Sequence, residues 1–127
     1  MSGYSTKSTK RLAAVWPIPQ RVRPVPVELI WTPQAREDLI EIYIYIGLDN
    51  PSAAERIYDA IQSKAEMLIE YPRLGVRRPD IRRSTRMLIE GSYLILHETQ
   101  PDTDEGLIQE VEIVRIIDGR RNLKNPL

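Results

Sequence analysis

Apolar residues recur at helical spacing in two consecutive stretches of the chain, separated by a short polar break. The first stretch runs from Pro33 to about Ile46, and its apolar face comprises Ala35, Leu39, Ile42 and Ile46. The second runs from Pro51 to about Glu70, and its apolar face comprises Ala54, Ile57, Tyr58, Ile61, Ala65 and Leu68. Thr32 and Asn50, each followed by a proline, are typical helix caps. Because the break is only GLDNPS, the pattern predicts an antiparallel helical hairpin.

Short apolar runs bounded by turn residues predict four strands. One precedes the helices and three follow them, at residues 27–31, 85–90, 93–98 and 110–118. In the last strand, alternation places Val111, Ile113, Arg115 and Ile117 on one face and Glu112, Val114 and Ile116 on the other. Since both faces carry apolar residues, we expect this strand to be central. The order predicts an α+β domain with an N-terminal strand and a helical hairpin that packs on a small antiparallel sheet.

The 127 residues are enough for one domain with one core. Residues 1–25 differ from the rest, because basic and hydroxyl residues are followed by a proline-rich run that blocks helices and central strands. We therefore expect an extended or disordered tail at 1–25 and a folded domain at 26–127.

The composition excludes several kinds of site. There is no cysteine and only one histidine, so disulfides, thiolate metal sites and histidine clusters are excluded, and we expect neither metal nor cofactor. The longest apolar run, LIEIYIYIGL, is about half the ~20 residues that a membrane-spanning helix needs. We expect a cytoplasmic protein without membrane contact.

Charge is segregated along the chain although the formal net charge is zero. Residues 31–70 carry eight acidic and three basic residues, whereas residues 71–97 carry six basic and two acidic ones. Residues 98–110 carry five acidic residues and no basic one. Such blocks indicate where a charged partner could bind. An alternative is a solvated rim of arginines that the protein's own acidic helices neutralise.

Arginines are the main candidates for a functional site, because the sequence has no glycine-rich phosphate loop and no recognisable nucleophile motif. The arginines expected to face a target or partner are Arg82, Arg83, Arg86, Arg115, Arg120 and Arg121. Their planar guanidinium groups suit phosphate or carboxylate. His97 is the one ready general acid or base, but a single histidine on an apolar strand is more often a packed residue.

Several short motifs occur in the order found in one protein family. WTPQAREDLIEIYIYIGLDNPSAAERIYDAI is followed by YPRLGVRRPDIR, YLIL and VEIVRIIDGRR. Over about residues 27–124 the chain resembles the ParE branch of the RelE/ParE toxin superfamily. The resemblance implies the toxin half of a bacterial toxin–antitoxin pair, which forms a hetero-oligomer with a cognate antitoxin protein. The positions that match recurrent family residues are Arg86, Tyr93, Arg115, Arg120 and Arg121.

The resemblance implies two activities and leaves a third outcome open. ParE-like toxins inhibit DNA gyrase by binding, so we expect a gyrase inhibitor rather than an enzyme. RelE-like relatives are ribosome-dependent mRNA endoribonucleases, and for that alternative the catalytic candidates are Arg86, Tyr93, His97 and Arg115. Many ParE-like members have His-Gly where this chain has Asp118-Gly119, which removes a possible acid or base and favours binding. A detoxified module that only binds antitoxin is the remaining alternative.

Overall fold

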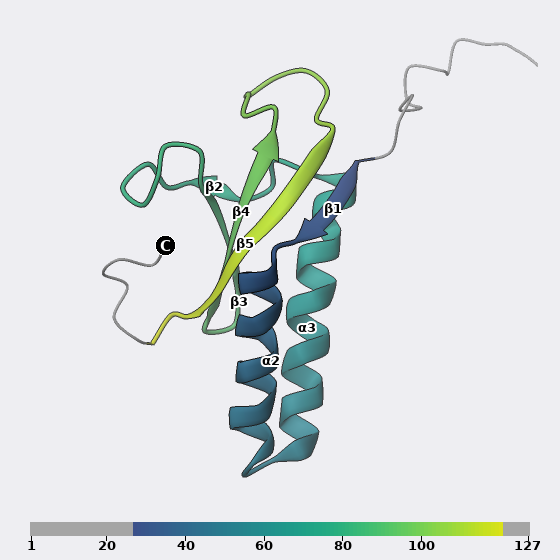
Figure 1. Cartoon of the computed structure of the whole chain (residues 1–127), viewed down its shortest axis with the longest axis vertical. Coiled ribbons are helices and arrows are strands. Elements are labelled where there is room, and N and C mark those ends of the chain that lie inside the picture. The colour runs from purple at the N-terminus through teal and green to yellow at the C-terminus, as the bar shows by residue number, and fades with distance from the viewer. Residues whose placement is uncertain (1–26, 121–127) are drawn as a thin grey trace, which may run out of the picture.

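The computed structural model describes residues 27–120, which form two helices and five strands (Figure 1). In chain order these are β1 (Glu28–Trp31), α2 (Pro33–Gly47), α3 (Pro51–Glu70), β2 (Val76–Arg77), β3 (Arg86–Glu90), β4 (Tyr93–Gln100) and β5 (Glu110–Asp118). The tail predicted for residues 1–25 and the candidate Arg121 lie outside the described residues. No helix in the described part is long and apolar enough to cross a membrane.

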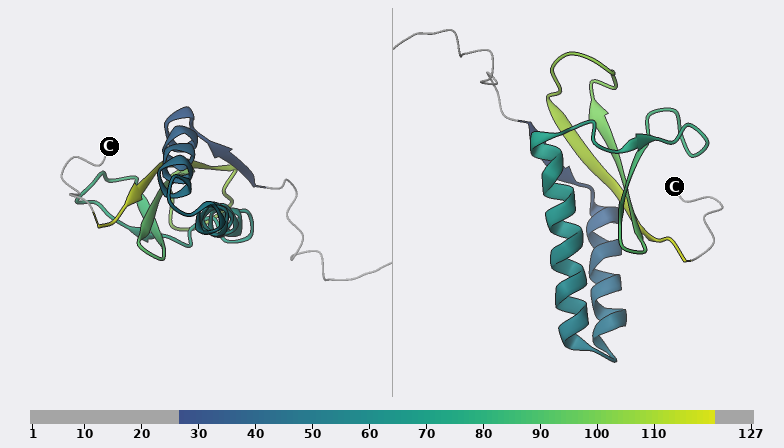
Figure 2. Two further views of the ribbon diagram at one scale, coloured as in Figure 1. Left: turned by 90° about the horizontal axis from the view of Figure 1, so that it is seen from below. Right: turned by 180° about the vertical axis from the view of Figure 1, so that it is seen from behind.

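The predicted α+β fold is confirmed, and the sheet has the strand order β1-β5-β4-β3-β2. The strands from β2 to β5 pair antiparallel, whereas β1 pairs parallel with β5 and makes the sheet mixed. The helices form an antiparallel hairpin whose turn projects well beyond the sheet (Figures 1 and 2). The sequence pattern indicated neither β2 nor the parallel pairing, because β2 has only two residues and strand pairing is not a local property.

Both helices begin where the sequence predicts, and the first is also fixed to the sheet. Thr32 Oγ1 accepts a hydrogen bond from Ala35 N at 3.2 Å and donates to Ile113 O at 2.9 Å. Asn50 Oδ1 accepts from Ala53 N at 3.1 Å. The threonine hydroxyl therefore caps α2 and holds its first turn against β5.

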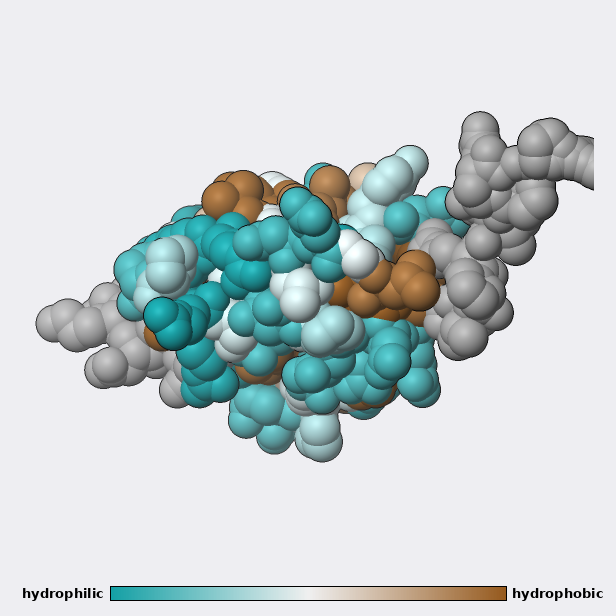
Figure 3. Space-filling view, turned by 90° about the horizontal axis from the view of Figure 1, so that it is seen from above, coloured by the Kyte–Doolittle hydropathy of each residue, from teal (hydrophilic) through white to brown (hydrophobic). Residues whose placement is uncertain are grey.

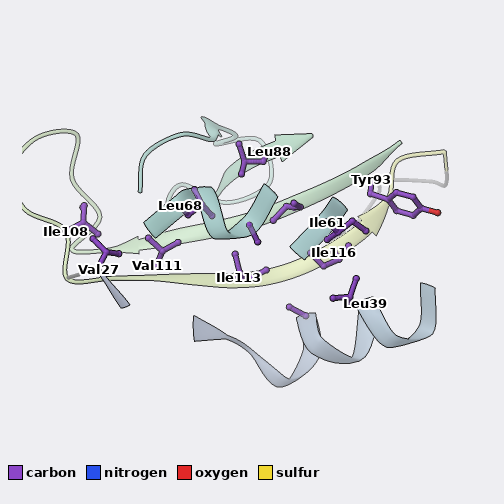
Figure 4. Close-up of a cluster of buried hydrophobic side chains, with 13 residues drawn as sticks. Val27, Leu39, Ile61, Leu68, Leu88, Tyr93, Ile108, Val111, Ile113 and Ile116 are labelled. Carbon is purple, nitrogen blue, oxygen red and sulfur yellow. The ribbon is translucent and has the colours of Figure 1, made fainter. Parts of the chain in front are cut away.

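The core lies between the hairpin and one face of the sheet (Figure 4). Its thirteen buried residues come from both helices, from the sheet and from the segments that flank β1 and β5, and most of them are branched aliphatic residues. Tyr93 is the one aromatic residue in this cluster. Since the chain has no phenylalanine, interlocking Ile, Leu and Val side chains supply most of the packing.

A bulge in β5 contradicts the assignment of residues to the two faces that the sequence predicted for this strand. Leu96 of β4 pairs with Arg115, but its neighbour His97 pairs with Ile113, so β5 contains one extra residue at this point. Beyond the bulge the faces exchange, and Ile116 rather than Ile117 joins Val111 and Ile113 in the core. The prediction of a central strand is nevertheless confirmed, because β5 lies between β1 and β4.

Candidate functional site

The predicted arginines differ in their place in the chain and in their surroundings. Arg86 is at the start of β3, and Arg82 and Arg83 lie in the preceding loop. Arg115 lies at the bulge of β5, and Arg120 follows the end of that strand. Arg86 is buried, and Arg115 pairs with a carboxylate of α2. The other described arginines of the set, Arg82, Arg83 and Arg120, are exposed.

Arg86 is an internal cross-link. Its side chain is only 7% exposed, and its Nη1 donates to Arg73 O and Gly75 O at 3.4 Å each. Its Nη2 donates to Asp104 Oδ1 at 3.1 Å. Burial lowers the pKa of Arg86, and the nearby Arg77 lowers it further. Arg86 thus joins the segment before β2 to the loop after β4.

Arg115 is held by α2 through a buried carboxylate. Arg115 Nε donates to Asp38 Oδ2 at 2.7 Å, and Nη2 donates to Oδ1 at 3.2 Å. The same Oδ2 accepts from Ile116 N at 3.0 Å. Pairing with β1 ends at Ile113, so Asp38 satisfies a backbone donor on the part of β5 that β1 does not reach. The hydrogen bond to Asp38 raises the pKa of Arg115.

Arg120 is exposed but pairs with the residue that departs from the family pattern. Its Nε lies 2.9 Å from Asp118 Oδ1, and its Nη2 lies 2.9 Å from Oδ2. The guanidinium carbon lies 5.9 Å from the centroid of the Tyr93 ring, and Nη2 lies 3.5 Å from the Tyr93 hydroxyl. Asp118 therefore orients Arg120 over an aromatic ring and neutralises part of its charge.

Arg82 and Arg83 are the most accessible of the predicted group. Both are exposed in the loop between β2 and β3. Arg82 Nη1 lies 3.9 Å from Glu98 Oε2, which is a long contact for an ion pair. Within the described residues, the guanidinium of Arg83 forms no ion pair. These two side chains can meet a partner without breaking an internal salt bridge of good geometry.

His97 is a buried, neutral residue. Its side chain is fully buried, and neither ring nitrogen has a hydrogen-bond partner within the described part of the chain. Burial lowers the pKa of His97 to about 4, and the neighbouring Arg86 contributes to the lowering. The imidazole packs on Gly75, where an added Cβ would collide with Nε2. Tyr93 also lies in the core, so neither proton carrier of the endoribonuclease alternative is freely exposed.

An exposed apolar row lies on α2 and its C-cap, at residues that the sequence analysis did not single out. Ile40, Ile44 and the C-cap residue Leu48 are 46%, 55% and 79% exposed, and their four-residue spacing places them in one row on the side away from the core. The available signal was the run LIEIYIYIGL, which contains more apolar residues than one buried face can use. Such a row is typical of a protein-binding surface.

Comparisons with known proteins identify the family to which the chain belongs. Residues 29–123 match the family described as "ParE toxin of type II toxin-antitoxin system, parDE". The chain belongs to the ParE toxin family. The resemblance recognised in the sequence is thereby confirmed, and the match covers nearly all of the described domain.

Two individual proteins illustrate the similarity. Over 76 residues the chain is 37% identical to Y4kP of Sinorhizobium fredii (strain NBRC 101917 / NGR234), which carries a provisional toxin name; the alignment covers 58% of this chain and 77% of Y4kP. A chain of the structure "Chromosomal ParDE TA system from P. aeruginosa" superposes with a TM-score of 0.58 at 25% identity. That superposition covers 71% of this chain and 92% of the other.

Proposed function

We propose that this ParE-family toxin inhibits DNA gyrase by binding to it in the bacterial cytoplasm, and that a cognate antitoxin neutralises it in a hetero-oligomeric complex. The family match supports the class of protein, and the buried state of His97 is the observation that favours binding over catalysis. General acid–base catalysis needs a group within reach of the substrate and with a pKa near the working pH. His97 has neither property.

The antitoxin contact is assigned to the exposed row Ile40, Ile44 and Leu48 on α2. A helix or extended segment of the antitoxin with apolar anchors would remove this row from water. Glu37 and Glu41 lie on the same exposed part of the helix, so basic groups at the margin of the antitoxin segment would complement them. Arg82 and Arg83 remain candidates for contact with gyrase, since they are exposed and weakly paired.

Controlled expression tests the proposal in cells. Expression of the chain alone should stop growth and induce the DNA damage response while cellular mRNA stays intact, and co-expression of the gene product encoded next to it should restore growth. Cleavage of mRNA on translating ribosomes would instead identify the RelE-type alternative. Normal growth with correctly folded protein would identify a detoxified module and would contradict gyrase inhibition.

A matched pair of variants tests the assigned antitoxin surface. Ile44→Glu places a charge in the centre of the apolar row and should weaken antitoxin binding by about tenfold or more. Ser63→Glu introduces the same charge at an exposed position of α3 and should leave the affinity within about twofold. Equal affinities of the two variants, measured by calorimetry, would show that the row is not in the interface.

A further inference from the structure

The loop that joins β4 to β5 spans residues 101–109 (Figure 1). Arginine side chains from the segment around β2 bind this loop. Arg73 Nε donates to Thr103 O at 2.7 Å, and Arg73 Nη2 donates to Thr103 Oγ1 at 3.0 Å and to Gly106 O at 2.9 Å. This loop is called the acidic loop below, because it contains Asp102, Asp104 and Glu105. The basic and acidic blocks of the sequence therefore meet within the fold.

A single carboxylate oxygen of the acidic loop is shared by two arginines. Asp104 Oδ1 lies 3.0 Å from both Nε and Nη2 of Arg77 and 3.1 Å from Nη2 of Arg86. Asp102 Oδ1 lies 3.0 Å from Nη1 of Arg77. Hydrogen bonding to Arg77 lowers the pKa of Asp104, so this carboxylate is ionised at neutral pH. The Asp104 side chain is 76% exposed, so this contact with the arginines lies at the surface, where anions from the solvent can compete with the carboxylate.

Polar atoms beside this contact are buried and lack partners. Arg86 Nε and both ring nitrogens of His97 have no hydrogen-bond partner within residues 27–120. The two residues lie opposite each other on β3 and β4, and both side chains are more than nine-tenths buried. Arg86 Nε is therefore a donor of the arginine cluster that the acidic loop does not use, in a surrounding where an unpaired donor is unfavourable.

We propose that Arg73, Arg77 and Arg86 form a phosphate-binding site, which the protein occupies with its own Asp104 carboxylate. The acidic loop then acts as an internal competitor that a phosphate group displaces. This site is separate from the apolar row on α2 and from Arg120, and it does not depend on the proposed gyrase inhibition. The end of the molecule seen from above is mainly hydrophilic (Figure 3).

The chemistry favours phosphate over another carboxylate. Arg77 and Arg86 pair with Asp102 and Asp104, whereas Arg73 binds neutral oxygens of Thr103 and Gly106. Among these contacts, three guanidinium groups therefore meet two carboxylates. A phosphate group offers at least as much charge as a carboxylate and more acceptor oxygens, and arginine forks bind such oxygens in pairs. The same chemistry is present in free phosphate and in the phosphodiester backbone of a nucleic acid.

Titration of the full chain with inorganic phosphate at constant ionic strength, followed by amide NMR, tests the site. The amide signals of residues 101–106 should shift in a saturable manner. Asp104→Asn removes the internal competitor and should raise phosphate affinity about two- to fivefold. Arg77→Gln, at a partly exposed position, should reduce it about tenfold or more. Asp59→Asn makes the same charge change as Asp104→Asn on the exposed part of α3 and is the matched control.

Two results would overturn the proposal. Equal gains in affinity from Asp104→Asn and Asp59→Asn would mean an effect of net charge. Unchanged binding in Arg77→Gln would mean that Arg77 does not contact the phosphate. A short single-stranded oligonucleotide, titrated in parallel, identifies the source of the phosphate. Binding of both probes with the same variant pattern identifies phosphate in either form, and binding of inorganic phosphate alone identifies the free anion.

Discussion

Acidification should destabilise the protein through His97, because the folded state holds this imidazole in its neutral form. His97 is fully buried without a hydrogen-bond partner in the described part of the chain, and its pKa is lowered to about 4 from an ordinary value of 6.5. The unfolded chain therefore takes up a proton more readily than the folded one. The stabilisation that neutral His97 contributes is fully present above pH 6.5, the pKa of the imidazole in the unfolded chain. It decreases as the pH falls from about 6.5 towards 4, the pKa in the folded protein.

The size of the effect follows from the two pKa values. Because the folded and unfolded states bind the proton with different pKa values, the free energy of unfolding falls by about 2 kcal/mol between pH 7.5 and pH 5. The loss reaches about 3 kcal/mol once the pH is below both pKa values. For a domain of about one hundred residues, 2 kcal/mol corresponds to a decrease of roughly 10 °C in Tm. This is a large share of the ~5–15 kcal/mol that usually stabilises a domain.

Denaturant unfolding at several pH values measures this loss directly. His97 is the only histidine of the chain, so few other side chains titrate between pH 5 and 6.5. His97→Leu removes the titrating group. The leucine side chain is apolar, and it is shorter than the imidazole that contacts Gly75. The variant should lose much less stability over this range. Parallel pH curves for the two proteins, or an imidazole NMR signal that titrates near pH 6.5, would refute the argument.

Three further substitutions test particular contacts. Gly75→Ala should destabilise the protein by about 1–3 kcal/mol in a thermal melt, because the new Cβ collides with the imidazole of His97. Gly47→Ala is the control: its Cβ would lie at an ordinary 3.6 Å from its nearest neighbour, so it should be neutral or stabilising. Asp38→Ala should cost about 1–3 kcal/mol in urea unfolding, since it leaves a buried backbone donor of β5 unpaired, and Glu41→Ala on the exposed face should change stability by less than about 0.5 kcal/mol. Arg120→Glu reverses the charge of an exposed side chain and should weaken antitoxin binding in calorimetry with little change in Tm, and unchanged affinity would place this side chain outside the interface.

The helices could be predicted closely because their signals are local. Thr32 and Asn50 act as caps in the structure as the sequence indicated, and the buried residues of α3 follow the predicted spacing. The family resemblance likewise rested on short motifs in a fixed order. These features depend on neighbouring residues, so one sequence contains the information.

The partners of the arginines could not be predicted, because they lie far away along the chain. Arg115 meets Asp38 across 77 positions, and Arg86 meets Asp104 across 18. The bulge beside Arg115 also moves Ile116 to the core face, which periodicity cannot show. The predicted alternative, neutralisation of the arginines by the acidic helices, applies to Arg115, which pairs with Asp38 of α2. The carboxylates that pair with Arg77 and Arg86 come instead from the acidic loop.

Inhibition of purified DNA gyrase tests the central claim most directly. The folded full-length chain, titrated into a supercoiling reaction, should inhibit supercoiling in proportion to its concentration, and pre-incubation with the cognate antitoxin should abolish the inhibition. A DNA-relaxing enzyme unrelated to gyrase is the control for non-specific DNA binding. Undiminished supercoiling at a large molar excess of folded toxin would contradict the account.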